Sequence, residues 1–387
     1  MRAANIRRFI FNEKANYLKF SLLIASNTNI LKKNHFRKSL NLWYFDHKRD
    51  LPWRNTTDPY KIWLSEIILQ QTRVNQGLSY YLKFEKNYPN IINLAEVEED
   101  KLMKDWEGLG YYSRARNLQA SAKHICSELN GTFPDQYSEI IKLKGVGEYT
   151  AAAISSFAFN EAHAVLDGNV FRFLSRYFGV DLPINSGEGK KYFKNLAQDL
   201  LDKKDPATYN QAIMEFGALQ CVPKNPSCMD CVFENSCVAY KTDRVKGLPV
   251  KKKTNYNRSR YFHFFYLESE GGVALERREQ KDIWSKLYQF PLVEGNEILS
   301  FDQLLEMPET QIILDKLGLT LKETLDLKPH KLSHQTIFSR VFRLEVQNGK
   351  ASEKFKWFSR GEINELGFPR PLRIFLDRIQ LTLPLES

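Results

Sequence analysis

Two acidic residues occupy positions where a carboxyl group could do chemistry. Glu66 lies in "WLSEIILQQT", where most neighbours are apolar, so we expect a buried carboxyl group with a raised pKa. Asp167 precedes the apolar-periodic stretch "GNVFRFLSRYF", so we expect an N-cap whose charged form is stabilised by helix N–H groups. One protonated and one ionised carboxyl group are the two roles that break a glycosidic bond through a cationic transition state. Taken separately, each residue also fits an ordinary helix.

A glycine-containing turn lies between these two acids in the sequence. The stretch "LKGVGEYTAAAI" places Gly145, Val146 and Gly147 between a short helix and an alanine-rich helix. A hairpin of this kind can direct backbone N–H groups toward a phosphate, because glycine permits close approach. The same turn is also common without any ligand, so alone it does not decide the function.

Four cysteines lie within 17 residues, in "CVPKNPSCMDCVFENSC" (Cys221, Cys228, Cys231 and Cys237), and only Cys126 occurs elsewhere. Disulfides suit small secreted domains, whereas this chain has 387 residues and is 43% hydrophobic, enough for ordinary cores. Metal binding is therefore favoured. Four-cysteine zinc sites usually combine two C-x-x-C pairs, and a single C-x-x-C with wider arms is also compatible with an iron–sulfur cluster.

The elements that must position these residues fall into two parts. Residues 35–240 show apolar residues at helical spacing, for example a helix over 60–74, and we see no strand pattern there. Residues 241–257, "KTDRVKGLPVKKKTNYN", have no apolar periodicity and predict a linker. In residues 258–387 the period changes to two, as in "YFHFFYLE" and "VALERRE" around "SEGG", which predicts a hairpin and an α+β domain.

The net charge of +10 suggests a nucleic-acid partner, but the basic excess is concentrated near the N-terminus. Residues 1–34 are basic and acid-poor, and we expect a disordered extension or a targeting segment. No apolar run reaches the roughly 20 residues that a membrane span needs. We expect a monomer in the bacterial cytoplasm, associated with the nucleoid, or a mitochondrial or nuclear protein if the extension is a targeting segment.

Six motifs in order carry a specific resemblance. The set "LPWR", "WLSEIILQQTRV", "GLGYYSRARNL", "LKGVGEYTAAAI", "LDGNV" and the four-cysteine cluster resembles the helix-hairpin-helix DNA glycosylases that hold an iron–sulfur cluster. More narrowly, it is similar to the adenine DNA glycosylases, from about residue 36 to the C-terminus. This resemblance implies an all-α glycosylase domain followed by a nudix-like α+β domain, and double-stranded DNA with adenine opposite 8-oxoguanine or guanine as substrate.

The resemblance also implies residue roles. Glu66 would be the general acid that protonates adenine N7, Asp167 would stabilise the sugar cation, and Tyr149 and Asn169 would assist near the sugar. The hairpin would bind the DNA phosphate, and the four cysteines would hold a 4Fe-4S cluster with nearby Lys224 facing the DNA backbone. The implied substrate-binding positions are Arg54 and Arg49 with Gln211 at the adenine pocket, Gln71, Thr72, Leu109 and Tyr111 at the opened duplex, and Ser333 and His334.

Two positions refine this interpretation. Glycosylase-lyases of the endonuclease III type have a lysine where this chain has Tyr149, so the resemblance favours a monofunctional enzyme that hydrolyses the bond without a Schiff base. The C-terminal part lacks the carboxylate box of an active nudix hydrolase and would instead sense 8-oxoguanine. In "HKLSHQT", Leu332 replaces the aromatic residue of the family's Phe-Ser-His loop.

Three other functions compete with this interpretation. A glycosylase-lyase acting on oxidised pyrimidines is disfavoured by Tyr149 and by the additional C-terminal domain. A non-catalytic DNA-binding module would not need both Glu66 and Asp167. An electron carrier would account for the cysteines, but it leaves the carboxyl groups, the hairpin and the second domain unexplained.

Overall fold

The computed structural model describes residues 32–252, 258–315, 317–332, 334–347 and 355–382. Most of the predicted N-terminal extension (1–34), the end of the predicted linker and Ser333 lie outside the described residues. No helix among the described residues is long and apolar enough to cross a membrane.

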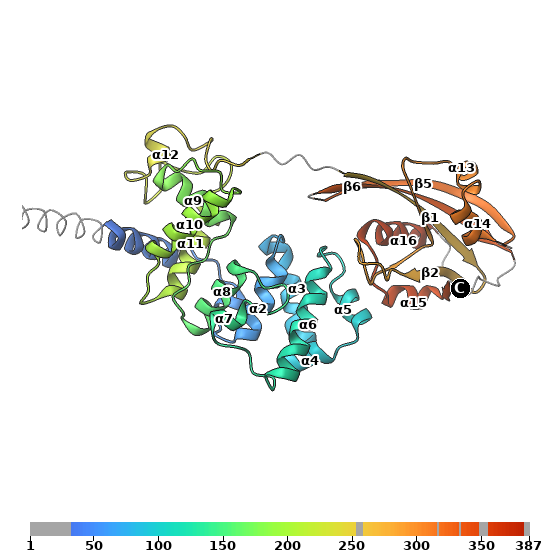
Figure 1. Ribbon diagram of the computed structural model, residues 1–387, viewed down its shortest axis with the longest axis horizontal. Coiled ribbons are helices and arrows are strands. Elements are labelled where there is room, and N and C mark those ends of the chain that lie inside the picture. The colour runs from blue at the N-terminus through green and yellow to red at the C-terminus, as the bar shows by residue number, and fades with distance from the viewer. Residues whose placement is uncertain (1–31, 253–257, 316, 333, 348–354, 383–387) are drawn as a thin grey trace, which may run out of the picture. The chain divides into compact units, whose positions relative to one another are not determined.

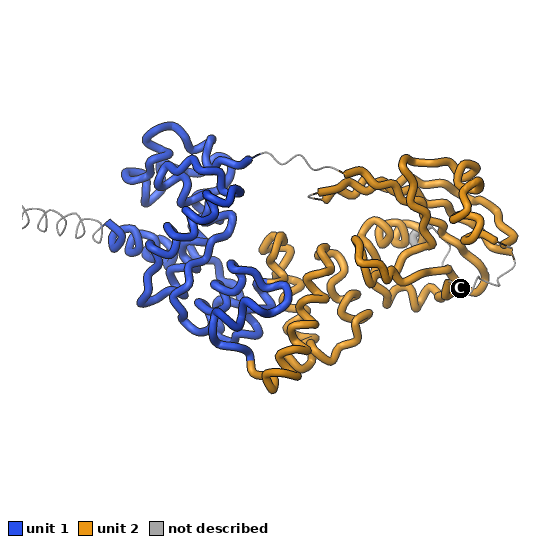
Figure 2. The backbone as a smooth tube through the Cα atoms, in the orientation of Figure 1, with its two compact units in different colours: residues 1–66, 133–253 blue, residues 67–132, 254–387 orange. Residues whose placement is uncertain are grey.

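The chain forms two compact units, which do not follow the order of the sequence. Figure 2 colours one unit, residues 1–66 with 133–253, blue, and the other, residues 67–132 with 254–387, orange. The helices in 67–132 therefore group with the C-terminal domain, although the sequence predicts one helical domain over 35–240. Hydrogen bonds between these helices and the C-terminal domain are described below.

The first unit is helical, as predicted. Its elements are a helix over 32–47, η1 (Pro52–Arg54), most of α2 (Pro59–Leu69), α7 (Tyr137–Ile140), α8 (Glu148–Phe159), α9 (Gly168–Phe178), α10 (Gly187–Leu200), α11 (Pro206–Leu219) and α12 (Val238–Lys241). An aromatic cluster joins the first helix, α9, α11 and the cysteine segment through Phe36, Phe173, Phe216 and Phe233. This core fixes the cysteine segment against α9 and α11.

Helix α9 begins and ends where the sequence predicts. The Asp167 carboxylate accepts a hydrogen bond from the backbone N–H of Val170 at 2.8 Å and caps the first turn. Gly179 ends the helix in the left-handed region, with φ +66°. These local signals place Asp167 at the N-terminus of α9, where a backbone N–H donates to its side chain.

The second unit begins with the end of α2 and continues through α3 (Val74–Asn87), α4 (Ile91–Glu96), α5 (Glu99–Asp105) and α6 (Ser113–Glu128). The helix predicted over 60–74 is interrupted: α2 ends at Leu69, Gln71 adopts φ +57°, and α3 starts at Val74. The apolar pattern alone did not reveal this turn, because it continues at helical spacing through the break.

The C-terminal part of this unit is a mixed sheet with helices. Its elements are β1 (Arg258–Ser269), β2 (Gly272–Arg277), β3 (Tyr288–Gln289), β4 (Leu292–Gly295), α13 (Phe301–Leu305), α14 (Pro308–Leu314), β5 (Leu319–Lys331), β6 (Gln335–Val346), β7 (Lys356–Phe358), α15 (Arg360–Glu365) and α16 (Arg370–Thr382). The strand order is β3-β2-β1-β6-β5, with β4 paired to β1 and β7 to β2. The predicted β1–β2 hairpin is confirmed, and β1 pairs with β6 in parallel.

The first half of the predicted linker packs on the helical unit. Leu248 is buried, and its carbonyl accepts a hydrogen bond from Arg176 Nε at 3.0 Å. Ile184 N donates to the carbonyl of Val250 at 3.0 Å. The apolar residues of "GLPV" therefore serve as a packing segment, although the composition of this stretch predicts a linker.

Gly217 on α11 allows a close contact with the start of α9. A Cβ added at this position would lie 2.8 Å from the backbone oxygen of Asn169, so Gly217→Ala forces the two helices apart. We expect a loss of about 1–3 kcal/mol in the free energy of unfolding, measured by denaturant titration. Gly187→Ala is the matched control, because nothing lies within 4 Å of a Cβ there. Equal stability of the two variants would contradict this packing.

Candidate active site

Glu66 is buried on α2, as the sequence predicts. The residue is 7% exposed, and burial raises the pKa of its carboxyl group to about 7. The negative charge of Asp167 also raises this pKa, while a hydrogen bond with Tyr149 and the positive charge of Arg54 lower it. The carboxyl group is therefore half protonated near neutral pH and can donate a proton.

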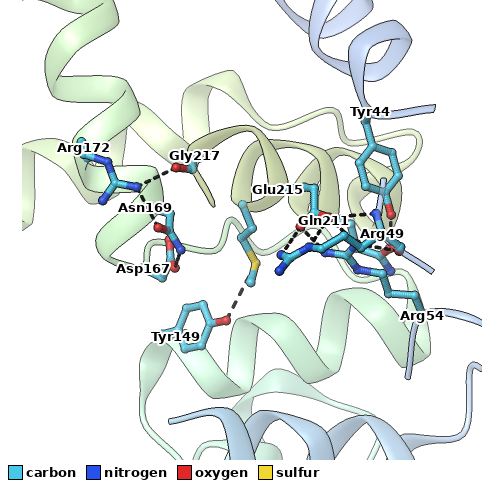
Figure 3. A network of polar contacts seen from close by, with 11 residues as sticks. Tyr44, Arg49, Arg54, Tyr149, Asp167, Asn169, Arg172, Gln211, Glu215 and Gly217 are labelled. Carbon is cyan, nitrogen blue, oxygen red and sulfur yellow. Dashed lines mark hydrogen bonds and ion pairs between the residues drawn. The ribbon is translucent and has the colours of Figure 1, made fainter. Parts of the chain in front are cut away.

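Asp167 sits in a network of donors at the start of α9 (Figure 3). Besides the capping bond from Val170 N, its second oxygen accepts a hydrogen bond from Asn169 Nδ2 at 2.7 Å. The sequence predicts that such donors stabilise the charged form, and they do lower the pKa. Burial is larger, however, and it raises the pKa of Asp167 overall, which corrects that expectation.

Tyr149 lies in the first turn of α8, between the two carboxyl groups. Its hydroxyl lies 3.8 Å from the sulfur of Met214 (Figure 3). A hydrogen bond between Tyr149 and Glu66 contributes to the pKa shifts of both residues. Burial and the negative charges of Glu66 and Asp167 raise the pKa of Tyr149 well above the ordinary value. Tyr149 is therefore a neutral hydrogen-bond donor, and it brings no amine to the site.

Arg54 and Arg49 lie together, held by a residue that the sequence analysis missed. Glu215 on α11 is 1% exposed and accepts bidentate hydrogen bonds from both guanidinium groups, at 2.6–2.9 Å. These bonds lower the pKa of Glu215 to about 2, against the effect of its burial. Gln211, one turn earlier, accepts a hydrogen bond from the hydroxyl of Tyr44 at 2.6 Å. The predicted adenine-pocket residues thus form one group.

The predicted phosphate hairpin is present. Gly145 adopts φ +83°, Val146 is buried, and Gly147 is the N-cap of α8, where a Cβ would have no atom within 4 Å. No side chain caps the first turn of α8. Its backbone N–H groups can therefore receive an anion.

The four cysteines line one cavity and form no disulfide. Phe173, Phe216, Phe233 and Arg176 complete its wall. Among the described residues, no group of three Cys, His, Asp or Glu side chains is placed to hold a metal ion. Burial and the neighbouring thiols raise the pKa of Cys231 to about 12, so this sulfur needs a cationic centre to become a thiolate at neutral pH.

Two arginines of α9 contact the cysteine segment, and one of them, Arg172, also contacts Asn169. Arg172 donates to the carbonyl of Cys221 at 2.7 Å and to Asn169 Oδ1 at 2.8 Å. Arg176 lies with Nη1 3.5 Å from the sulfur of Cys221 and donates to the carbonyl of Val222 at 2.8 Å. Arg172 therefore links Asn169, which donates to Asp167, directly to the backbone of Cys221.

Gln71, Leu109 and Tyr111, which the resemblance places as wedges in the opened duplex and which we call the wedge residues, lie on turns organised by Arg114 on α6. Its guanidinium donates to the carbonyls of Ile68 and Gln70, at 2.9 and 2.6 Å, after the body of α2. It also donates to the carbonyls of Leu109 and Gly110, at 3.1 and 3.2 Å. One buried cation therefore fixes both turns relative to each other.

The wedge residues themselves have unusual backbones. Gln71 and Tyr111 adopt φ +57° and +46°. Residues other than glycine rarely take these backbone conformations, which cluster at functional sites. Tyr111 is 40% exposed, whereas Leu109 is only 7% exposed. The hydroxyl of Thr72 lies 3.4 Å from Arg114, at the same junction. The predicted set is thus brought together, with Leu109 enclosed.

The predicted 8-oxoguanine loop joins β5 and β6. Leu332 N donates to the carbonyl of Gln335 at 2.8 Å, and the carbonyl of His334 accepts from Arg258 N at 3.3 Å. His334 is exposed, and Ser333 lies outside the described residues.

Comparison with known proteins follows the division into a helical and a C-terminal domain that the sequence predicts. Residues 64–209 match the HhH-GPD superfamily of base excision DNA repair proteins, and residues 263–378 match the NUDIX domain family. The adenine DNA glycosylase of Buchnera aphidicola subsp. Baizongia pistaciae is 33% identical over 355 residues, covering 89% of this chain and 96% of that protein. The adenine DNA glycosylase of Homo sapiens is 40% identical over 213 residues, covering 53% of this chain and 39% of that protein.

Among solved structures, a thermostable thymine-DNA glycosylase is similar to 55% of this chain and 99% of its own, with 30% identity and a TM-score of 0.52. The two family matches confirm a helix-hairpin-helix domain followed by a nudix-like domain with a sheet. Since the similarity to the Buchnera protein extends over nearly the whole of both chains, this chain belongs to the adenine DNA glycosylase family.

Proposed function

We propose that this protein is a monofunctional DNA glycosylase that hydrolyses the N-glycosidic bond of adenine opposite 8-oxoguanine or guanine. The observation that carries the proposal is the pair of buried carboxyl groups on α2 and α9, in which burial raises the pKa of Glu66 to about 7. Membership of the family supports adenine as the base.

Glu66 supplies the proton. In its protonated form it donates to N7 of adenine, which makes the base a better leaving group. The bond between C1′ and the base then breaks, and its electron pair moves to the base. The hydrogen bond with Tyr149 orients the Glu66 carboxyl group for this transfer.

Asp167 stabilises the sugar cation that remains. Its carboxylate is fixed by Val170 N and Asn169, so it needs no reorganisation when positive charge develops. The developing cation favours the ionised form of Asp167 and opposes the effect of burial. Water then adds to C1′ and completes the hydrolysis.

The DNA is held by backbone donors and opened by the wedge turns. The hairpin from Gly145 to Gly147 offers N–H groups to a phosphate, which fixes the register of the strand. Gln71, Leu109 and Tyr111, on the turns that Arg114 fixes, fill the space that the extruded nucleotide leaves. Extrusion costs a few kcal/mol of stacking, which such contacts help to offset.

Discrimination of the opposite base is assigned to the C-terminal domain. The exposed His334 and the neighbouring Ser333 can offer hydrogen bonds to the altered edge of 8-oxoguanine, which has a C8 carbonyl and a proton on N7.

The four cysteines are assigned to a 4Fe-4S cluster. They line one cavity, and their single C-x-x-C with wider arms is compatible with such a cluster. Arg176 places its positive charge 3.5 Å from the sulfur of Cys221, beside the proposed cluster. When bound, the cluster orders the segment 221–237, and we assign it no part in bond breaking.

Replacing the general acid tests the mechanism. Glu66→Gln should lower the single-turnover rate of adenine release by about 10²- to 10⁴-fold, because the amide cannot donate a comparable proton. DNA binding should persist.

The pH dependence of adenine release tests whether the protonated form of Glu66 is the active one. Because the acid form of Glu66 is the active one and its pKa is about 7, wild-type release at subsaturating enzyme should fall about tenfold from pH 6 to pH 8. Glu188→Gln, on the exposed start of α10, is the control and should behave as wild type. A Glu66→Gln variant within twofold of wild type would refute the assignment.

Tyr149→Lys tests the monofunctional assignment. A lysine at this position can attack C1′ and form a Schiff base, so borohydride should trap an enzyme–DNA adduct with the variant and little with wild type. Tyr149→Phe is the control and should give no adduct. Equal trapping of all three proteins would place the reactive amine elsewhere and contradict the assignment.

The cluster is tested by composition. Protein purified without oxygen should contain about four irons and four acid-labile sulfides per chain. Cys231→Ser should lose most of both, whereas Cys126→Ser, outside the cavity, should retain them. Stoichiometric zinc without acid-labile sulfide would contradict the assignment of a 4Fe-4S cluster.

A further inference from the structure

The loop between α5 and α6 is built to hold a special conformation. Its sequence, "EGLGYY" over 107–112, carries Leu109 and Tyr111, the proposed wedge residues. Gly108 and Gly110 adopt φ +96° and +72°, and a Cβ at Gly108 would lie 2.4 Å from the hydroxyl of Tyr80. Glycine at these two positions permits the left-handed backbone that the loop adopts between Glu107 and Tyr112.

Both ends of this loop are hydrogen-bonded to one residue of the C-terminal domain. The backbone N–H of Phe368 donates to the Glu107 carboxylate at 3.1 Å. The hydroxyl of Tyr112 donates to the carbonyl of Phe368 at 3.1 Å. Phe368 is fully buried, so its backbone has no water to replace these partners. The wedge residues thus lie between two attachment points.

Arg373 on α16 strengthens the first attachment. Its Nε donates to Glu107 at 2.8 Å, its Nη2 donates to the carbonyl of Leu366 at 2.6 Å, and its guanidinium lies over the Phe368 ring, 5.0 Å from the centroid. The side chains of Glu107 and Arg373 are only 14% and 15% exposed. Lys104 pairs with the other oxygen of Glu107 at 3.0 Å. Loss of Arg373 therefore leaves Glu107 one charged partner and deprives the oxygen that faces Phe368 N of its charged donor.

We propose that Glu107, Phe368 and Arg373 couple recognition of the opposite base to opening of the duplex. These three are positioning residues: they transmit the state of the C-terminal domain to Leu109 and Tyr111. The inference rests on the proposed function and adds a route by which the opposite base influences adenine release. A domain that reads one strand affects chemistry on the other only if its state reaches the groups that hold the extruded nucleotide.

A second contact provides a matched control. Arg277 on β2 pairs with Glu99 and Asp100 on α5, at 2.7 and 3.0 Å, and Tyr288 donates to Asp100 at 2.9 Å. This contact also attaches the C-terminal domain to the helices, but it does not touch the wedge loop. If both contacts only attach the C-terminal domain to the helices, breaking either one should change adenine release equally.

The experiment compares Glu107→Gln and Arg373→Met with Arg277→Met. Single-turnover adenine release is measured at saturating enzyme on duplexes with adenine opposite 8-oxoguanine and opposite guanine. Base unstacking is measured separately in the Glu66→Gln background, from the fluorescence of 2-aminopurine placed beside the target adenine. Glu107→Gln and Arg373→Met are independent tests of one contact, so a variant that does not fold leaves the other to decide.

We expect either loop variant to lower the ratio of the two release rates by about tenfold, the effect of one charge-assisted hydrogen bond, and to reduce the fluorescence rise. The double variant should be no worse than the single ones, and Arg277→Met should keep the ratio within about twofold. Unchanged ratios, or an equal loss in Arg277→Met, would overturn the inference. If wild type releases no adenine, the proposed function fails, and the fluorescence comparison still tests the coupling.

Discussion

The two carboxyl groups that we propose as catalytic are both removed from water, and much of the surrounding structure compensates for that. Burial raises the pKa of Glu66 and of Asp167, and the negative charge of Asp167 raises the pKa of Glu66 further. The compensation is unequal: Glu66 has a hydrogen bond from Tyr149, whereas Asp167 has backbone and amide donors at a helix start. This asymmetry divides the roles, because the carboxylate with more donors faces the cation and the other keeps the proton.

Buried arginines hold the site in this geometry. Arg54 is fixed by Glu215, Arg172 links Asn169 to the cysteine segment, and Arg176 anchors that segment to α9. Each guanidinium has several donors in a rigid plane, so one side chain satisfies carbonyls from segments far apart in the sequence. The donors around Asp167 are therefore in place before substrate arrives, which is the condition for electrostatic stabilisation of a transition state.

Local signals in the sequence predict much of this site. The cap at Asp167, the stop at Gly179, the glycine hairpin and the buried Glu66 each depend on neighbours a few residues away, and all are confirmed. Glu215 carries the same signal as Glu66, an acid within the apolar stretch "AIMEFGAL". It was missed because its partners, Arg49 and Arg54, are distant in sequence. Arg172 and Glu107 could not be predicted, because their partners, Cys221 and Phe368, are distant in sequence. The pKa of Asp167 was misjudged for the same reason, since burial depends on the whole fold.

The central claim is that Glu66 holds a proton near neutral pH before DNA binds. The direct measurement is the carboxyl ¹³C chemical shift of Glu66 in DNA-free protein with labelled glutamate, assigned by its absence in Glu66→Gln and followed across pH. The account predicts a titration midpoint near 7, because burial raises the pKa of Glu66 to about 7. A midpoint near 4.5, the ordinary value for glutamate, would show that the carboxyl group is ionised at neutral pH and would contradict its role as the general acid.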